Sequence, residues 1–144
     1  MRLRQKSSGL ILVVENNAHT RTIAVVILQS ANFRVIEARD VHEALGSLCF
    51  FSDIQVVFMG CSMPVSNDDI SFVRSVQKLS PAIKILMTSA DMCPDTNSLP
   101  LGVSFIAQPY RQSVLIHDIQ SLLGDRTTGS MAPQRRDKRV LTSR

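Results

Sequence analysis

The chain has 144 residues and a formal net charge of +4, with 44% hydrophobic and 19% charged residues. This size fits one domain with its own core, and this composition excludes a wholly disordered chain and a fibrous one. No apolar run approaches the roughly 20 residues that a membrane-spanning helix needs, and the basic N-terminus lacks the pattern of a secretory signal peptide. We therefore expect a cytoplasmic protein with no membrane contact.

The basic charge lies at the two ends of the chain. Residues 1–6 hold three basic side chains, and residues 125–144 hold six against two acidic ones, whereas residues 7–124 hold seven basic and ten acidic side chains. The last twenty residues have little apolar content and no helical period. We expect a basic extension over 1–8, a folded domain over 9–124 and a disordered basic tail over 125–144.

The first half of the domain alternates strands with helices. The continuous apolar run over 10–14 predicts a strand buried on both faces. Apolar residues at helical spacing predict a helix within 19–31, and residues 33–38 form a second, shorter strand. Asp40, followed three residues later by Glu43, is typical of a helix N-cap with a capping-box acid. It opens a helix whose apolar stripe runs from 41 to 48.

The second half continues the alternation. Strands are predicted over 54–59, 83–87 and 103–107, with a helix marked by apolar residues 70, 73 and 76 and a final helix that stops at Gly124. Residues 91–100 contain two prolines and no apolar stripe. Because proline costs about 3 kcal/mol inside a helix, we expect only a short, irregular or mobile helix there. An ordered helix of three turns would contradict this expectation.

This order predicts an α/β fold with a doubly wound, five-stranded parallel sheet covered by helices on both faces. In such sheets the ligand site lies at the carboxyl ends of the strands. Four of these ends read Glu15-Asn16-Asn17, Gly60 to Pro64, Thr88-Ser89-Ala90 and Gln108-Pro109. Any functional site should therefore lie where these four segments meet.

The same four segments resemble the receiver domain of two-component response regulators, over about residues 9–124. Glu15-Asn16 is similar to its acidic pair, Met63-Pro64 to the end of its phosphoacceptor loop, Thr88-Ser89-Ala90 to its hydroxyl position, and Gln108-Pro109-Tyr110 to its lysine-proline segment. The resemblance implies a flavodoxin-like fold with strand order 2-1-3-4-5. In that family an aspartate takes a phosphoryl group from a phosphohistidine, assisted by magnesium and a lysine. A hydroxyl and an aromatic ring then report the modification.

Three positions depart from the family's pattern. Gly60 stands where the phosphoacceptor aspartate should be, Asn16 takes the second place of the acidic pair, and Gln108 replaces the lysine. Glycine has no nucleophile, and a neutral amide is a poor ligand for a hard cation. Glu15 alone remains of the charged set. The resemblance thus implies a degenerate pseudo-receiver with no phosphoacceptor aspartate, no metal site beyond the vestigial Glu15, no cofactor, and weak or absent magnesium binding.

Two further positions keep the family's residue types. Ser89 fits the switch hydroxyl and Phe105 the switch aromatic, although a strand-capping serine and a core phenylalanine are the more frequent roles of such residues. The resemblance also implies a cis peptide bond at Gln108-Pro109.

We expect a bacterial signalling module that acts by protein–protein interaction without phosphorylation. Its partner would be a histidine kinase, a phosphotransfer protein or another regulator, and a homodimer remains open. A receiver phosphorylated at another carboxylate (Glu15, Asp68 or Asp69) is one alternative. The other is a regulator that uses its basic tail on nucleic acid, which is disfavoured because the tail offers no aromatic side chain for base stacking.

An enzyme is not expected. The sequence contains no glycine-rich phosphate loop, and His19, His42 and His117 are scattered without ligand spacing. Cys49, Cys61 and Cys93 match no metal or disulfide pattern, so they are interpreted as small apolar core fillers.

Overall fold

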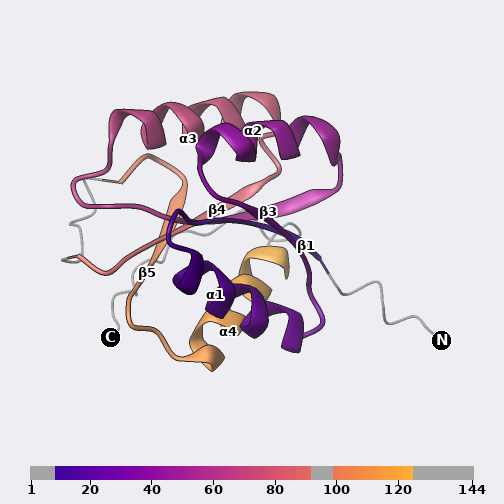
Figure 1. The fold of residues 1–144 in the computed structure, drawn as a ribbon. Coiled ribbons are helices and arrows are strands. Elements are labelled where there is room, and N and C mark those ends of the chain that lie inside the picture. The colour runs from indigo at the N-terminus through magenta and orange to yellow at the C-terminus, as the bar shows by residue number, and fades with distance from the viewer. Residues whose placement is uncertain (1–8, 92–98, 125–144) are drawn as a thin grey trace.

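The fold is described from a computed structural model that covers residues 9–91 and 99–124. Five parallel strands form one sheet in the order β2-β1-β3-β4-β5, and helices cover both of its faces (Figure 1). The predicted fold class and strand order are confirmed. The elements in chain order are β1 (Leu10–Val14), α1 (Ala18–Ser30), β2 (Arg34–Ala38), α2 (Val41–Phe50), β3 (Ile54–Gly60), α3 (Asn67–Leu79), β4 (Lys84–Ser89), β5 (Val103–Ala107) and α4 (Gln112–Gly124).

Strand β1 lies inside the sheet, which explains its continuous apolar sequence. It pairs with β2 on one side and with β3 on the other, and all five of its residues are buried. Its side chains alternate between two cores, as the period of a strand requires. Leu10, Leu12 and Val14 pack in one core, and Ile11 and Val13 pack in the other.

The two cores correspond to the two helical layers. Helices α2 and α3 lie on one face of the sheet, and α1 and α4 lie on the other (Figure 1). Phe72, Val73 and Val76 of α3 fill the first core, whereas Leu115 and Ile119 of α4 fill the second. Helices therefore cover both faces of the sheet, in agreement with the rule for all-parallel sheets.

Short polar side chains start three of the helices. Asn17 caps α1 by accepting the Thr20 N–H, Asp40 caps α2 by accepting the Glu43 N–H, and Ser66 caps α3 by accepting the Asp69 N–H. The Glu43 carboxylate returns to the Arg39 N–H at 2.7 Å, one residue before the cap. The predicted cap at Asp40 is thus confirmed, with the acid bonded to the preceding residue.

Strands β3 and β4 each extend further than the apolar pattern predicts. Their pairing continues to Gly60 opposite Thr88, and β4 continues to Ser89 opposite Ala107. Hydrophobicity does not report these polar or small residues, but the backbone ladder includes them. As a result, the carboxyl ends of the strands reach directly into the region where a site is expected.

Several expectations concern residues outside the described ranges. The basic extension, the tail, Cys93 and most of the irregular segment over 91–100 fall there. Within the described residues, no helix has the length and apolar character needed to cross a membrane.

Candidate functional site

The carboxyl ends of β1, β3, β4 and β5 meet along one edge of the sheet. A cleft of about 510 Å³ lies over this edge. It brings together Glu15, Asn16, Gly60, Ser89 and Gln108, which are the five positions that the sequence singles out. Its other polar lining residues are Thr20, Arg39, Asp40, Cys61, Ser62, Ser66, Asp68, Asp69 and Asp91.

The floor of the cleft contains a close approach between Glu15 and Gly60. A β-carbon built on Gly60 would overlap Oε1 of Glu15 and would lie 3.0 Å from its carboxylate carbon. The carboxylate of Glu15 therefore fills the place that a side chain of residue 60 would need. In this arrangement β3 contributes no carboxylate to the cleft, and Glu15, the residue after β1, provides the carboxylate at this point.

The hydrogen bonds of Glu15 bind it to the start of α1. Its Oε2 accepts the Asn17 N–H at 2.9 Å, and its carbonyl oxygen accepts from Nη1 of Arg21 at 2.8 Å. The Arg21 guanidinium directs its Nε to Glu37 instead, at 3.1 Å. Among the described residues, no cationic side chain forms an ion pair with the Glu15 carboxylate.

The amides that flank Glu15 do not close the site. Asn16 is exposed and Gln108 is half-buried. The backbone N–H of Gln108 donates to the Ser89 carbonyl at 3.1 Å, which joins β5 to β4.

The cleft also lacks a free cation among the described lining residues, because Arg39 is paired with Glu43 at 2.9 Å. The peptide bonds Gln108-Pro109 and Met63-Pro64 are both cis. The first was expected from the family resemblance, and the second was not predicted.

Ser89 and Phe105 have ordinary structural surroundings. The Ser89 side chain is buried, and its hydroxyl oxygen accepts the Asp91 N–H at 3.0 Å. Phe105 is half-buried and packs against the core beneath α2 and α3. In this conformation the serine caps the end of β4 and the phenylalanine is part of the core.

Acidic side chains give the cleft its electrostatic character. Burial raises the pKa of the Cys61 thiol to about 12, and the charges of Asp69, Asp91 and Glu15 contribute to the rise. Burial also raises the pKa of Asp69, as does the neighbouring Asp68. Cys61 is therefore a protonated thiol at neutral pH. It is half-buried and packs against the core beneath α2 and α3, in agreement with its interpretation as an apolar filler.

The cysteine interpretation is wrong for Cys49, which is exposed on α2. The helix turns this position outward, and a residue count cannot tell a core cysteine from a surface one. The three histidines are exposed. Within the described ranges, no group of three or more His, Cys, Asp or Glu side chains could hold a metal ion.

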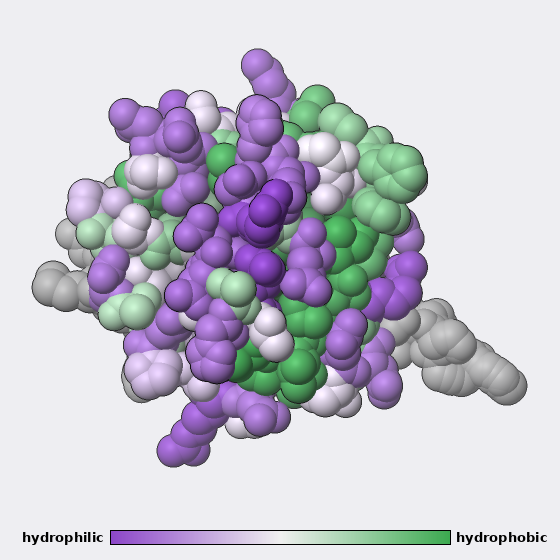
Figure 2. Space-filling model, viewed as in Figure 1, coloured by the Kyte–Doolittle hydropathy of each residue, from purple (hydrophilic) through white to green (hydrophobic). Residues whose placement is uncertain are grey.

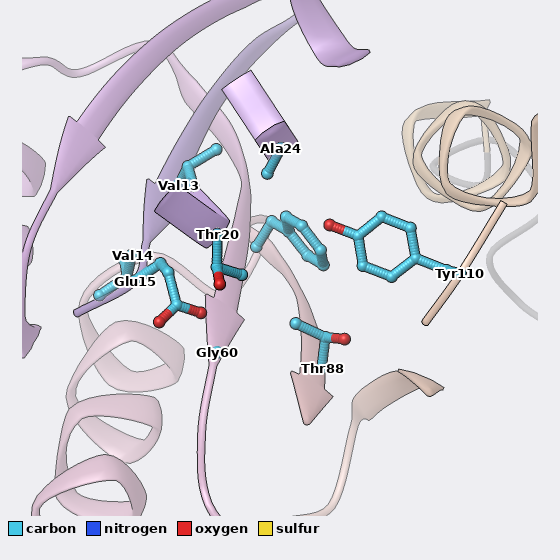
Figure 3. Close-up of a pocket in the computed structure, with 9 residues that line it drawn as sticks. Val13, Val14, Glu15, Thr20, Ala24, Gly60, Thr88 and Tyr110 are labelled. Atoms are coloured by element: carbon cyan, nitrogen blue, oxygen red, sulfur yellow. The ribbon is translucent and has the colours of Figure 1, made fainter. Parts of the chain in front are cut away.

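A second, smaller cavity adjoins the cleft and was not predicted from the sequence (Figure 3). It shares Glu15, Thr20 and Gly60 with the cleft, and it adds Thr88 and Tyr110. The Tyr110 ring packs edge-on against Phe58, with 6.0 Å between ring centroids. Thr88 belongs to one of the four strand-end segments that the sequence singles out, but its place in a cavity with Tyr110 was not predicted.

Comparisons with known proteins identify the family. The model of the response regulator receiver domain matches residues 11–120, so the chain belongs to the receiver domain family of two-component response regulators. Receiver domains are signalling modules that interact with kinases and other signalling proteins. No curated protein matches this chain.

Solved structures share the fold. A response regulator from Thermotoga maritima is 23% identical over 81% of this chain and 98% of its own, with a TM-score of 0.70. A CheY-like receiver domain protein from Methanospirillum hungatei is 26% identical over 81% of this chain and 94% of its own, with a TM-score of 0.66. The chemotaxis protein CheY4 of Vibrio cholerae is 22% identical over 80% of this chain and 98% of its own, with a TM-score of 0.68.

Proposed function

We propose that this receiver domain is a degenerate one, which signals through protein–protein interaction without aspartyl phosphorylation. The observation that carries the proposal is the overlap between Glu15 and the place of a residue 60 side chain. A phosphoacceptor at the end of β3 needs that space, and here the carboxylate of Glu15, the residue after β1, occupies it. A side chain at position 60 would require this carboxylate to move.

The electrostatics of the cleft support the same proposal. Phosphoryl transfer concentrates negative charge that a divalent cation and a lysine must neutralise. Asn16 and Gln108 are neutral where the family has an acid and a lysine. Glu15, the one carboxylate that remains at the family's charged positions, already accepts a backbone N–H. Because Asn16 and Gln108 add no charge beside it and magnesium binds through carboxylates, we propose weak or absent magnesium binding and no cofactor.

Exposed apolar side chains on α1 and α4 form the surface that we propose for partner binding. Ile23 and Val26 on α1 are 44% and 58% exposed, and Val114 on α4 is 42% exposed. Both helices cover the same face of the sheet (Figure 1), and apolar side chains reach the surface over α1 (Figure 2). Apolar side chains exposed on one face are typical of a protein interaction site. A histidine kinase, a phosphotransfer protein or another regulator would dock there.

Treatment with magnesium and acetyl phosphate, followed by intact mass measurement, tests the proposal. We expect no phosphoryl adduct on this chain. The matched control is a variant with the three family residues restored, Asn16→Asp, Gly60→Asp and Gln108→Lys, which should gain an adduct if the rest of the fold is competent. A stoichiometric adduct on the unaltered chain would contradict the proposal, and mapping would then begin at Glu15, Asp68 and Asp69.

A further inference from the structure

The small cavity beside Glu15 contains a buried polar group that has no partner. The Thr88 side chain lines this cavity, Thr88 is 3% exposed, and its hydroxyl oxygen has no hydrogen-bond partner among the described residues. Buried hydroxyls in native proteins are nearly always paired with protein or with an ordered water, because an unpaired one loses its hydration without compensation. The Thr88 hydroxyl therefore requires a partner that no described residue provides.

The cavity has about the size of one water molecule. Its volume is about 10 Å³, close to the roughly 10–15 Å³ that one water molecule needs. A buried water makes two to four hydrogen bonds to polar groups. Most of the cavity wall is apolar, and the lining residues with side-chain oxygens are Glu15, Thr20, Thr88 and Tyr110.

Tyr110 is the most suitable second partner. Its hydroxyl points into the cavity, and the Thr88 hydroxyl is turned to the side from which Tyr110 enters (Figure 3). Burial raises the pKa of Tyr110, and the charge of Glu15 raises it further. The phenol stays protonated at neutral pH and can donate a hydrogen bond.

We propose that one ordered water molecule occupies this cavity and bridges the hydroxyls of Thr88 and Tyr110. Thr88 belongs to β4, and Tyr110 belongs to the loop between β5 and α4, so the water joins two segments at the floor of the site. The same loop carries Gln108 to the cleft. The inference does not depend on whether the chain is phosphorylated.

Two substitutions test the bridge by their effect on the melting temperature. Thr88→Val replaces the hydroxyl with a methyl group of similar shape, and Tyr110→Phe removes the other hydroxyl. If water bridges the two groups, each change should lower the melting temperature by roughly 3–6 °C. The double variant should fall by less than the sum, because both changes remove the same bridge. Thr22→Val, at an exposed position of α1, is the matched control and should change it little.

A high-resolution crystal structure of the unaltered protein supplies the second measurement, and it does not depend on how the variants fold. We expect one water peak within hydrogen-bond distance of Thr88 Oγ1 and Tyr110 Oη. A rise in melting temperature for Thr88→Val would overturn the proposal, because an unpaired hydroxyl is improved by an apolar replacement. A direct bond between the two hydroxyls, or a cavity without density, would overturn it as well.

Discussion

At the scale of single residues, Glu15 and Gly60 have to be understood as a pair. Glu15 holds its carboxylate over Gly60 and also accepts the Asn17 N–H. A side chain at position 60 would displace the end of a flexible glutamate rather than rigid backbone. The cost of such a change should therefore depend on whether Glu15 is present.

A double-mutant cycle measures this dependence. Gly60→Ala should destabilise the protein more when Glu15 is present than in a Glu15→Ala background, with a coupling of about 0.5–3 kcal/mol. The free energy of unfolding in urea gives all four values. Gly46→Ala is the control, because a β-carbon there meets no atom within 4 Å, and it should stabilise α2 by about 0.5–1 kcal/mol. A coupling near zero would show that the two positions are independent.

At the scale of elements, the loop after β1 combines the site with the start of α1. Asn17 accepts the Thr20 N–H at 2.9 Å and its own N–H donates to Glu15. One residue earlier, Asn16 lines the cleft without a cap role. The two neighbouring asparagines therefore separate helix capping from the site.

Substituting each asparagine with alanine should show that Asn17 stabilises α1 and that Asn16 does not. Asn17→Ala removes the N-cap and should lower the free energy of unfolding by about 1 kcal/mol. Asn16→Ala, at an exposed position, should change it by less than about 0.5 kcal/mol. Urea denaturation of both variants compares them directly. Equal losses at the two positions would mean that the cap does not stabilise α1.

At the scale of the whole molecule, one sheet joins two cores on its opposite faces. Leu12 on β1 belongs to the core beneath α2 and α3, and Leu115 on α4 belongs to the core beneath α1 and α4. Both leucines are fully buried. Because the strands are shared, loss of either core should unfold the entire domain.

Leucine-to-alanine substitutions test this cooperativity. Leu12→Ala and Leu115→Ala should each lower the free energy of unfolding by about 2–5 kcal/mol. Both should keep a single transition that coincides by circular dichroism and by fluorescence of an extrinsic core probe. Leu79→Ala is the control, because that leucine is 69% exposed, and it should change stability by less than about 0.5 kcal/mol. A two-step transition would show that the faces unfold separately.

The sequence by itself determined the elements and the residues at the strand ends. The continuous apolar run of five residues identifies β1 as a strand inside the sheet, because such a run must be buried by helices on both faces. Topology then places Glu15, Gly60, Ser89 and Gln108 at one edge, since parallel strands all end on the same side of the sheet. Local capping chemistry likewise predicts the cap at Asp40.

Only the tertiary structure decided how those residues use the space between them. The carboxylate of Glu15 lies over Gly60, and the hydroxyl of Thr88 is enclosed beside Tyr110. Both facts depend on side chains from segments far apart in the sequence, and on the rotamers that their shared packing permits. A sequence pattern reports which face a residue occupies, but the contacts across that face are fixed when the strands and helices pack together.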